Sequence, residues 1–71
     1  MSTAPFTTSL AHRIREARYA ANLSQVEAAA EMGVSPRTWQ GWESGRTPRP
    51  RHRRALVAWF ARVADSREKV A

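Results

Sequence analysis

The sequence predicts an all-α fold, a compact domain of four helices. Two short segments between Ser24 and Gly45 each carry their own helix-start and helix-stop signals. In the segments before and after them, apolar residues recur at the spacing of one helix face. A chain of 71 residues suits one small domain with a modest core. We expect a flexible arm over residues 1–8, a domain over residues 9–65 and a frayed tail over residues 66–71.

The first predicted helix begins after Ser9, a good N-cap residue, and runs to about Ala21. Asn22 suits the left-handed position that often follows a helix end. One apolar stripe should face the core, and it consists of Leu10, Ile14, Ala17 and Ala21. The neighbouring residues Arg13, Arg15 and Glu16 are expected to face outward.

Two further helices follow in quick succession. Ser24 and Glu27 have the spacing of a capping box, and Gly33 supplies the positive φ that ends a helix. A second start signal comes two residues later, with Ser35 as N-cap and Pro36 at the first helical position. Helices separated by so few residues must cross steeply, as in a helix-turn-helix.

The third helix should end at Gly45, with Trp39 and Trp42 on its buried face beside Val34. A last helix is expected from about residue 50 or 51 to Asp65. Its apolar stripe consists of Leu56, Trp59, Phe60 and Val63. Part of this stripe closes the core, and Trp59, Phe60 and Val63 are also candidates for a dimer interface.

The charge balance favours a polyanionic partner. Twelve basic residues, eleven of them arginine, oppose six acidic ones and give a net charge of +6. DNA is the first candidate, followed by RNA and an anionic membrane surface.

Other classes of function have little support in the sequence. The chain has no cysteine, and His12 and His52 stand alone, so neither a metal site nor a cofactor is expected. No carboxylate pair, nucleophile with its base, or phosphate-binding glycine loop suggests an enzyme. No apolar run reaches the ~20 residues of a membrane span, and the N-terminus lacks the features of a signal peptide. A cytoplasmic protein is therefore expected.

Several short motifs occur at fixed spacing between residues 23 and 45. They are Leu23-Ser24-Gln25, Ala29, Gly33-Val34-Ser35, Thr38-Trp39, Trp42-Glu43 and Gly45. Together these motifs resemble one known family, the Cro/C1-type (XRE) helix-turn-helix regulators. The likeness covers roughly residues 10–60. It implies a lambda-repressor-like fold of four helices, with a fifth in many members, and a regulator that binds double-stranded DNA.

The resemblance places base reading on the outward face of the third helix. That face comprises Pro36, Arg37, Gln40, Gly41 and Ser44. Arginine pairs with guanine and glutamine with adenine in the major groove. Arg37 in the first helical turn opposes the helix dipole, which makes sense if an anion binds there. Gly41 departs from the family, in which a larger polar residue is usual, and it either permits close approach to a base pair or marks a lost contact.

Phosphate contacts are also implied by the resemblance. The candidates are Arg18, Gln25, Ser35, Thr38, Arg46, Arg49 and Arg51. In the family, a glutamate at the position of Glu43 pairs with an arginine near the end of the first helix. We therefore expect an Arg18–Glu43 salt bridge that also orients Arg18 toward the DNA backbone.

The predicted function is a sequence-specific repressor, a homodimer on a palindromic operator, without a small-molecule ligand. The recognition helix is similar to that of short regulators from phages and mobile elements, including anti-CRISPR-associated autorepressors. One alternative is an antitoxin-like module that masks a partner protein, in which the apolar stripe around Trp59 would be exposed. Another is a cationic amphipathic peptide on anionic membranes, although the repeated cap signals argue against it.

Overall fold

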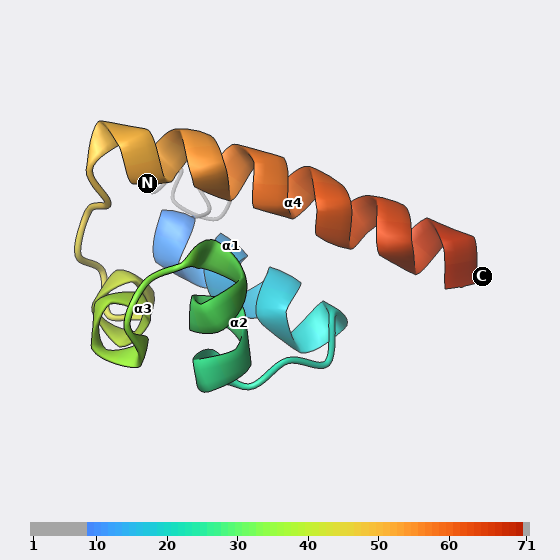
Figure 1. The fold of residues 1–71 in the computed structure, drawn as a ribbon, viewed down its shortest axis with the longest axis horizontal. Helices are drawn as coiled ribbons and strands as arrows, with labels where there is room; N and C mark the ends of the chain where they lie inside the picture. The colour runs from blue at the N-terminus through green and yellow to red at the C-terminus, as the bar shows by residue number, and fades with distance from the viewer. Residues whose placement is uncertain (1–8, 71) are drawn as a thin grey trace, which may run out of the picture.

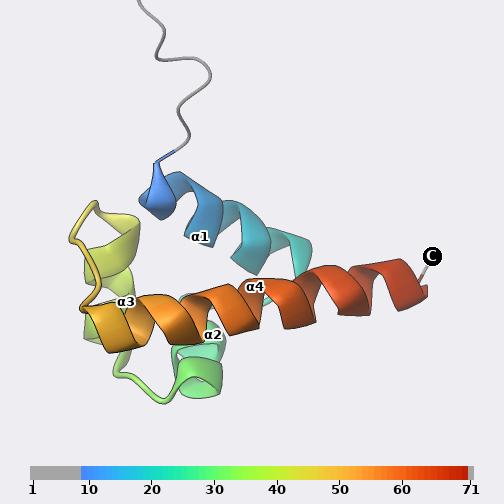
Figure 2. The same ribbon diagram turned by 90° about the horizontal axis from the view of Figure 1, so that it is seen from above.

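The computed structural model describes the backbone of residues 9–70 and the side chains of residues 9–65. Within this part the chain forms four helices and no strand. These are α1 (Leu10–Ala20), α2 (Gln25–Met32), α3 (Pro36–Glu43) and α4 (Pro50–Val70). The long helix α4 lies along one side of the molecule, and the three shorter helices gather against it (Figures 1 and 2). The predicted all-α fold is confirmed.

Each of the three short helices begins at a serine cap. The hydroxyl groups of Ser9, Ser24 and Ser35 accept hydrogen bonds of 3.0–3.1 Å from the backbone N–H three residues further on. The Glu27 carboxylate accepts a hydrogen bond of 2.8 Å from the Ser24 N–H, which completes the predicted capping box. Local hydrogen bonds that the sequence specifies directly therefore fix these helix starts.

The ends of the same helices share a second device. Asn22, Gly33 and Gly45 have φ values of 61°, 72° and 109°. Beyond each of them a backbone N–H bonds to the carbonyl five residues earlier. These bonds are Leu23 to Arg18 at 3.0 Å, Val34 to Ala29 at 3.0 Å and Arg46 to Gly41 at 2.9 Å. This pattern satisfies carbonyl groups that the helix end would otherwise leave unpaired.

The core is built around aromatic rings from α3 and α4. Trp39 and Trp59 are fully buried, and their rings meet edge to face at 5.3 Å. Ile14 from α1 and Leu56 from α4 are buried with them. Because indole rings are large, these contacts supply much of the apolar burial available to so short a chain. One side of α3, which carries Trp39 and Trp42, is therefore buried in the core.

The structure corrects the interpretation of the stripe on α4. Trp59 is 0% exposed and Val63 8% exposed, so both are core residues and cannot form an exposed dimer surface. Phe60 is half-buried and packs against the core, with the Arg13 guanidinium 5.3 Å from its ring centre. The apolar stripe of α4 lies in or against the core because α4 packs against both α1 and α2.

The last helix continues to Val70, beyond the end expected near Asp65. Residues 66–70 contain neither proline nor glycine, so the sequence has no signal that would stop the helix there. The proposed arm, residues 1–8, lies outside the described residues.

Candidate nucleic-acid interface

Helix α3 has a buried face and an open face. Trp39, Trp42 and Glu43 are buried. The opposite side, here called the α3 outer face, consists of the predicted base-reading residues Pro36, Arg37, Gln40, Gly41 and Ser44. All of them are exposed except Gly41, which is half-buried. The structure therefore brings the predicted residues together on one accessible surface.

A shallow hollow lies on this surface. Arg37, Gln40, Gly41 and Ser44 line it together with Arg46 from the loop that follows α3. Guanidinium and amide groups at its edge can each form paired hydrogen bonds with the edge of a base. The hollow thus combines accessible space with the side-chain chemistry that reads bases.

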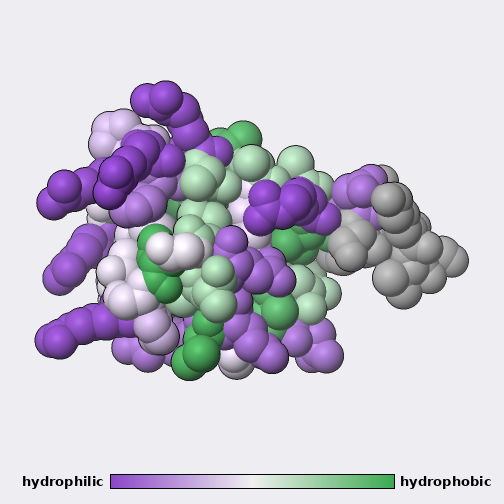
Figure 3. Space-filling model, in the orientation of Figure 1, coloured by the Kyte–Doolittle hydropathy of each residue, from purple (hydrophilic) through white to green (hydrophobic). Residues whose placement is uncertain are grey.

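Five exposed arginines surround the end of α3 and the start of α4. They are Arg46, Arg49, Arg51, Arg53 and Arg54. Between described side chains, the ion pairs are those of Arg15 and Arg18 with Glu43, so none of these five arginines is paired with a described acidic side chain. Figure 3 shows hydrophilic side chains projecting from the side of the molecule where α3 and the start of α4 lie.

The loop that carries part of this charge is anchored to the body. Pro48 is buried between the exposed residues Thr47 and Arg49. The Gly45 φ of 109° turns the chain back at the end of α3, and the Arg46 N–H bonds to the Gly41 carbonyl. The arginines of the loop therefore project from a fixed backbone.

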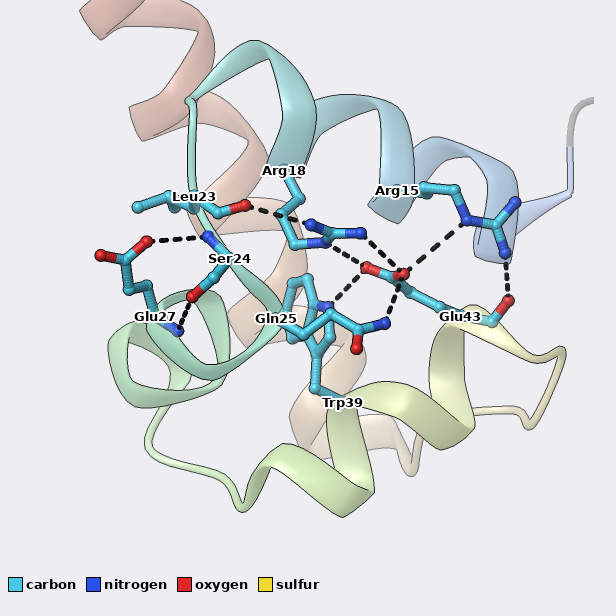
Figure 4. A network of polar contacts seen from close by, with 8 residues as sticks. All are labelled: Arg15, Arg18, Leu23, Ser24, Gln25, Glu27, Trp39 and Glu43. Carbon is cyan, nitrogen blue, oxygen red and sulfur yellow. Dashed lines mark hydrogen bonds and ion pairs between the residues drawn. The ribbon is translucent and has the colours of Figure 1, made fainter.

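One buried carboxylate holds α3 in place. Glu43 accepts hydrogen bonds from Arg18 Nε at 2.7 Å and Arg18 Nη2 at 3.2 Å. It also accepts from Trp39 Nε1 at 2.6 Å and Gln25 Nε2 at 3.0 Å (Figure 4). The predicted Arg18–Glu43 salt bridge is present. It ties α1 to α3, and Gln25 adds α2 to the same group.

Arg15 is part of this arrangement, although the sequence interpretation placed it facing outward. Its Nη2 donates to the Glu43 backbone carbonyl at 2.8 Å, and its Nε lies 3.7 Å from Glu43 Oε1. Arg15 thereby caps a carbonyl at the C-terminus of α3, where a positive charge also suits the helix dipole. Its place three residues before Arg18, on the same side of α1, is the sequence signal that points to this role. We call Glu43, Arg15, Arg18, Gln25 and Trp39 the Glu43 cluster.

The cluster shifts the ionisation of its two central groups. Burial alone raises the pKa of Glu43, but the hydrogen bonds from Arg18, Gln25 and Trp39 outweigh it and hold that pKa below its ordinary value. The hydrogen bond to Glu43 raises the pKa of Arg18 further. The ion pair is therefore fully charged at neutral pH.

Arg18 is not available for the phosphate contact that the resemblance implied. It is 8% exposed, and its guanidinium donates to Glu43 and to the Leu23 carbonyl at 3.1 Å. Because these interior acceptors hold the guanidinium and little of the side chain is exposed, Arg18 connects α1 to α3 within the fold. We correct its assignment to a purely structural one.

The other phosphate candidates lie at helix starts or in the basic loop. Gln25, at the first position of α2, is half-buried and donates to Glu43. The Ser35 hydroxyl donates to Thr38 Oγ1 at 3.0 Å and accepts from the Thr38 N–H at 3.1 Å, so both residues form the first turn of α3. Arg46, Arg49 and Arg51 remain exposed.

Glu31 of α2 has a role that the sequence analysis did not identify. Its carboxylate accepts a hydrogen bond of 2.9 Å from Trp59 Nε1. This bond satisfies a buried indole donor, a need that becomes evident only once α4 is seen to lie across α2.

The residues that the structure describes contain no cluster of three or more acidic, histidine or cysteine side chains able to hold a metal ion. Within the same part of the chain, no helix is long and apolar enough to cross a membrane.

Comparison with known families identifies most of the chain. A family model described as "Helix-turn-helix domain" matches residues 9–67. No curated protein matches the sequence, and no solved structure matches the chain. The match includes all of α1, α2 and α3 and most of α4.

Proposed function

This chain belongs to the helix-turn-helix domain family, and from that premise we propose that it is a sequence-specific regulator that binds double-stranded DNA through the α3 outer face. The observation that carries the proposal is the position of Arg37 and Gln40. Both are exposed on α3, near five exposed arginines that pair with no described acidic side chain, while the Glu43 cluster holds the opposite side of the helix. Members of such families read base edges with the second helix of the motif.

Base recognition would come from the side chains around the hollow on α3. The Arg37 guanidinium can donate two hydrogen bonds to guanine O6 and N7, and the Gln40 amide can pair with adenine N6 and N7. Ser44 can donate to or accept from either kind of base pair. Pro36 borders the same face and adds an apolar contact.

Positions beside this face would hold the phosphates. Arg49 and Arg51 project from the anchored loop and the start of α4, where charge adds affinity without sequence information. Gln25, Ser35 and Thr38 lie in the first turns of α2 and α3. Helix N-termini there direct backbone N–H groups outward, which favours binding of an anion.

A homodimeric repressor is the form of regulator that we propose. Two copies related by a two-fold axis would place their α3 helices in successive major grooves, ~34 Å apart, on an inverted-repeat operator. Such a protein would act in the cytoplasm at the nucleoid, and we propose a promoter of a phage or mobile element, including its own, as its target. Trp59 and Val63 cannot supply the dimer contact because the core buries them.

The partner-masking alternative loses its main support. It required the apolar stripe around Trp59 to be exposed in the isolated chain. Trp59 is fully buried, and Leu56 is 1% exposed.

Selection from random duplex DNA tests the proposal directly. The purified protein should enrich a two-fold symmetric motif with half-sites about one helical turn apart. Arg37→Ala should then relax preference at particular base pairs, a loss of about 1–3 kcal/mol of discrimination. Arg49→Ala is the matched control, because it should weaken binding to all sequences alike and reduce the salt slope by about one unit. The absence of any enriched motif would refute sequence-specific binding.

A further inference from the structure

The α3 outer face has a gap in its side chains, and one arginine from outside the helix occupies it. Gly41 lies in the middle of α3, on the side that faces solvent. A Cβ placed at Gly41 would lie 3.6 Å from Arg46 Cδ, 3.7 Å from Arg46 Nε and 3.9 Å from Arg46 Cβ. The side chain of Arg46 therefore lies along the surface of α3 at the one position that has no side chain of its own.

The backbone holds Arg46 in this place. Gly45, with φ 109°, reverses the chain at the end of α3, and the Arg46 N–H bonds to the Gly41 carbonyl at 2.9 Å. The same two residues thus meet through the main chain and through the Arg46 side chain. A left-handed residue such as Gly45 is needed for this return, and glycine adopts it at the least cost.

We infer that Arg46 reads a base pair, using the space that Gly41 leaves on α3, and does not serve mainly as a phosphate contact. The inference rests on the proposed DNA-binding function and deepens it. Arg46 would add a second guanidinium to the reading surface, beside that of Arg37. The expected target is a guanine, whose O6 and N7 accept the paired donors of arginine.

The surroundings of Arg46 distinguish it from the other basic residues of the loop. It lines the hollow together with Arg37, Gln40 and Ser44, whereas Arg49 and Arg51 do not. Its side chain is exposed and makes no ion pair with another described residue, so the surrounding described residues leave it accessible to a ligand. A residue placed among base-reading side chains is positioned for bases, while one beyond them is positioned for the backbone.

Gly41 then has a defined role. Glycine weakens a helix interior, so its presence on an exposed helix face calls for a reason other than stability. The distances to Arg46 are ordinary van der Waals contacts, so an alanine fits beside it. A long side chain would instead compete with Arg46 for the hollow.

The test compares substitutions at both positions in the same selection from random duplex DNA. Arg46→Lys keeps the charge but lacks the planar fork that pairs with guanine. It should lose about tenfold or more in preference for guanine at one position of the half-site, with unchanged salt dependence. Gly41→Gln should lose preference at that same position, Gly41→Ala should retain it, and Arg37→Ala should affect a different position.

The outcomes separate the inference from the proposed function. If the unsubstituted protein enriches a motif and Arg46→Lys enriches the same one, Arg46 contacts phosphate and the inference is overturned while the function stands. If the unsubstituted protein enriches nothing, both fail. Arg46→Ala, with Arg49→Ala as its control, provides a second comparison: uniform weakening in both variants would also overturn base reading by Arg46. Thermal melts followed by circular dichroism should match that of the unsubstituted protein for the arginine variants, because these side chains are exposed. Gly41→Ala and Gly41→Gln should melt at the same temperature or somewhat higher, because both residues favour a helix interior more than glycine does.

Discussion

Replacing Glu43 by glutamine should destabilise the fold strongly, because Glu43 is the acidic residue buried among the described residues. Glu43 is 5% exposed, and its two oxygens accept bonds from Arg18, Gln25 and Trp39. Glutamine keeps the shape but has one acceptor oxygen and no charge. The buried Arg18 would lose its counter-ion, and donors that converge on one position would compete for the remaining oxygen.

The size of the effect follows from the burial of both partners. Removing one member of a buried ion pair costs about 3–5 kcal/mol, since the other charge remains in the interior. The glutamine oxygen can still accept a hydrogen bond, which returns about 1 kcal/mol. We therefore expect a loss of about 2–4 kcal/mol, out of a total of about 4–11 kcal/mol for a chain of this length. The melting temperature should fall by roughly 10–30 °C.

Urea denaturation followed by circular dichroism measures this loss. Glu16→Gln is the matched control, since Glu16 is exposed on α1 and its change should stay within about 0.5 kcal/mol. Arg18→Met combined with Glu43→Gln completes a double-mutant cycle, and the double variant should be more stable than the two single losses imply. If Glu43→Gln costs no more than Glu16→Gln, the carboxylate does not organise the three helices and the reasoning fails.

The same substitution carries a pH signature. The pKa of Glu43 is below its ordinary value in the folded protein, so the unfolded chain takes up the proton first as the pH falls. The contribution of Glu43 to stability is complete above an unfolded pKa of about 4.3 and declines as the pH falls through the lower folded value. The gap in stability between the unsubstituted protein and Glu43→Gln should therefore be larger at pH 7 than at pH 3. An equal gap at both would contradict the assigned ionisation.

Three smaller predictions concern helix ends and the core. Gly33→Ala should cost about 1–2 kcal/mol of unfolding free energy, because alanine is strained at a φ of 72°. Nothing lies within 4 Å of the added methyl group, so a larger loss in urea denaturation would mean that backbone strain is not the whole cause. Asn22→Gly, at φ 61°, should change stability by less than about 1 kcal/mol, and a clear loss would show that the asparagine side chain contributes there. Trp59→Phe should lose about 2–4 kcal/mol, from the Glu31 hydrogen bond and lost packing, whereas Glu31→Gln keeps an acceptor and should lose less than half as much.

Helix boundaries were largely predictable from the sequence because local bonds set them. The serine caps, the capping box at Ser24 and the left-handed residues Asn22 and Gly33 act within a few residues of chain. The end of α4 was not predictable in the same way. The sequence has no helix-stop signal between Asp65 and Val70. Without such a signal, local pattern alone does not determine where α4 ends.

The contents of the core and the site were predictable only in part. The division of α3 into inner and outer faces follows from helical periodicity, and the salt bridge to Arg18 came from the family resemblance. The contact of Glu31 depends on how α4 crosses α2, which no local pattern encodes. The i, i+3 spacing of Arg15 and Arg18 places both on one side of α1, but the bond of Arg15 to the Glu43 carbonyl also depends on how α1 crosses α3. The sequence also could not decide whether Trp59 belongs to the core or to a dimer interface, since an apolar stripe shows that a helix face is covered but not what covers it.

The structure gives the glycine at position 41 an interpretation that the sequence left open. In the sequence, a glycine in a recognition helix is either a lost contact or a close approach. The structure adds the return of the chain at Gly45, which brings Arg46 beside it from outside the helix. The turn at Gly45 therefore lets α3 and the loop after it contribute side chains to one surface, and the structure shows how close Gly41 and Arg46 lie.

Stability and recognition meet in α3, because its inner face carries the Glu43 cluster and its outer face carries the candidate base readers. Loss of folding lowers apparent DNA affinity only by the folded fraction. A variant that retains about 1 kcal/mol of stability is still about 85% folded, so unfolding alone would hardly weaken binding. A Glu43→Gln protein that remains mostly folded yet binds DNA tenfold more weakly would therefore indicate that the cluster sets the orientation of α3. Unchanged affinity at the same folded fraction would confine the cluster to stability.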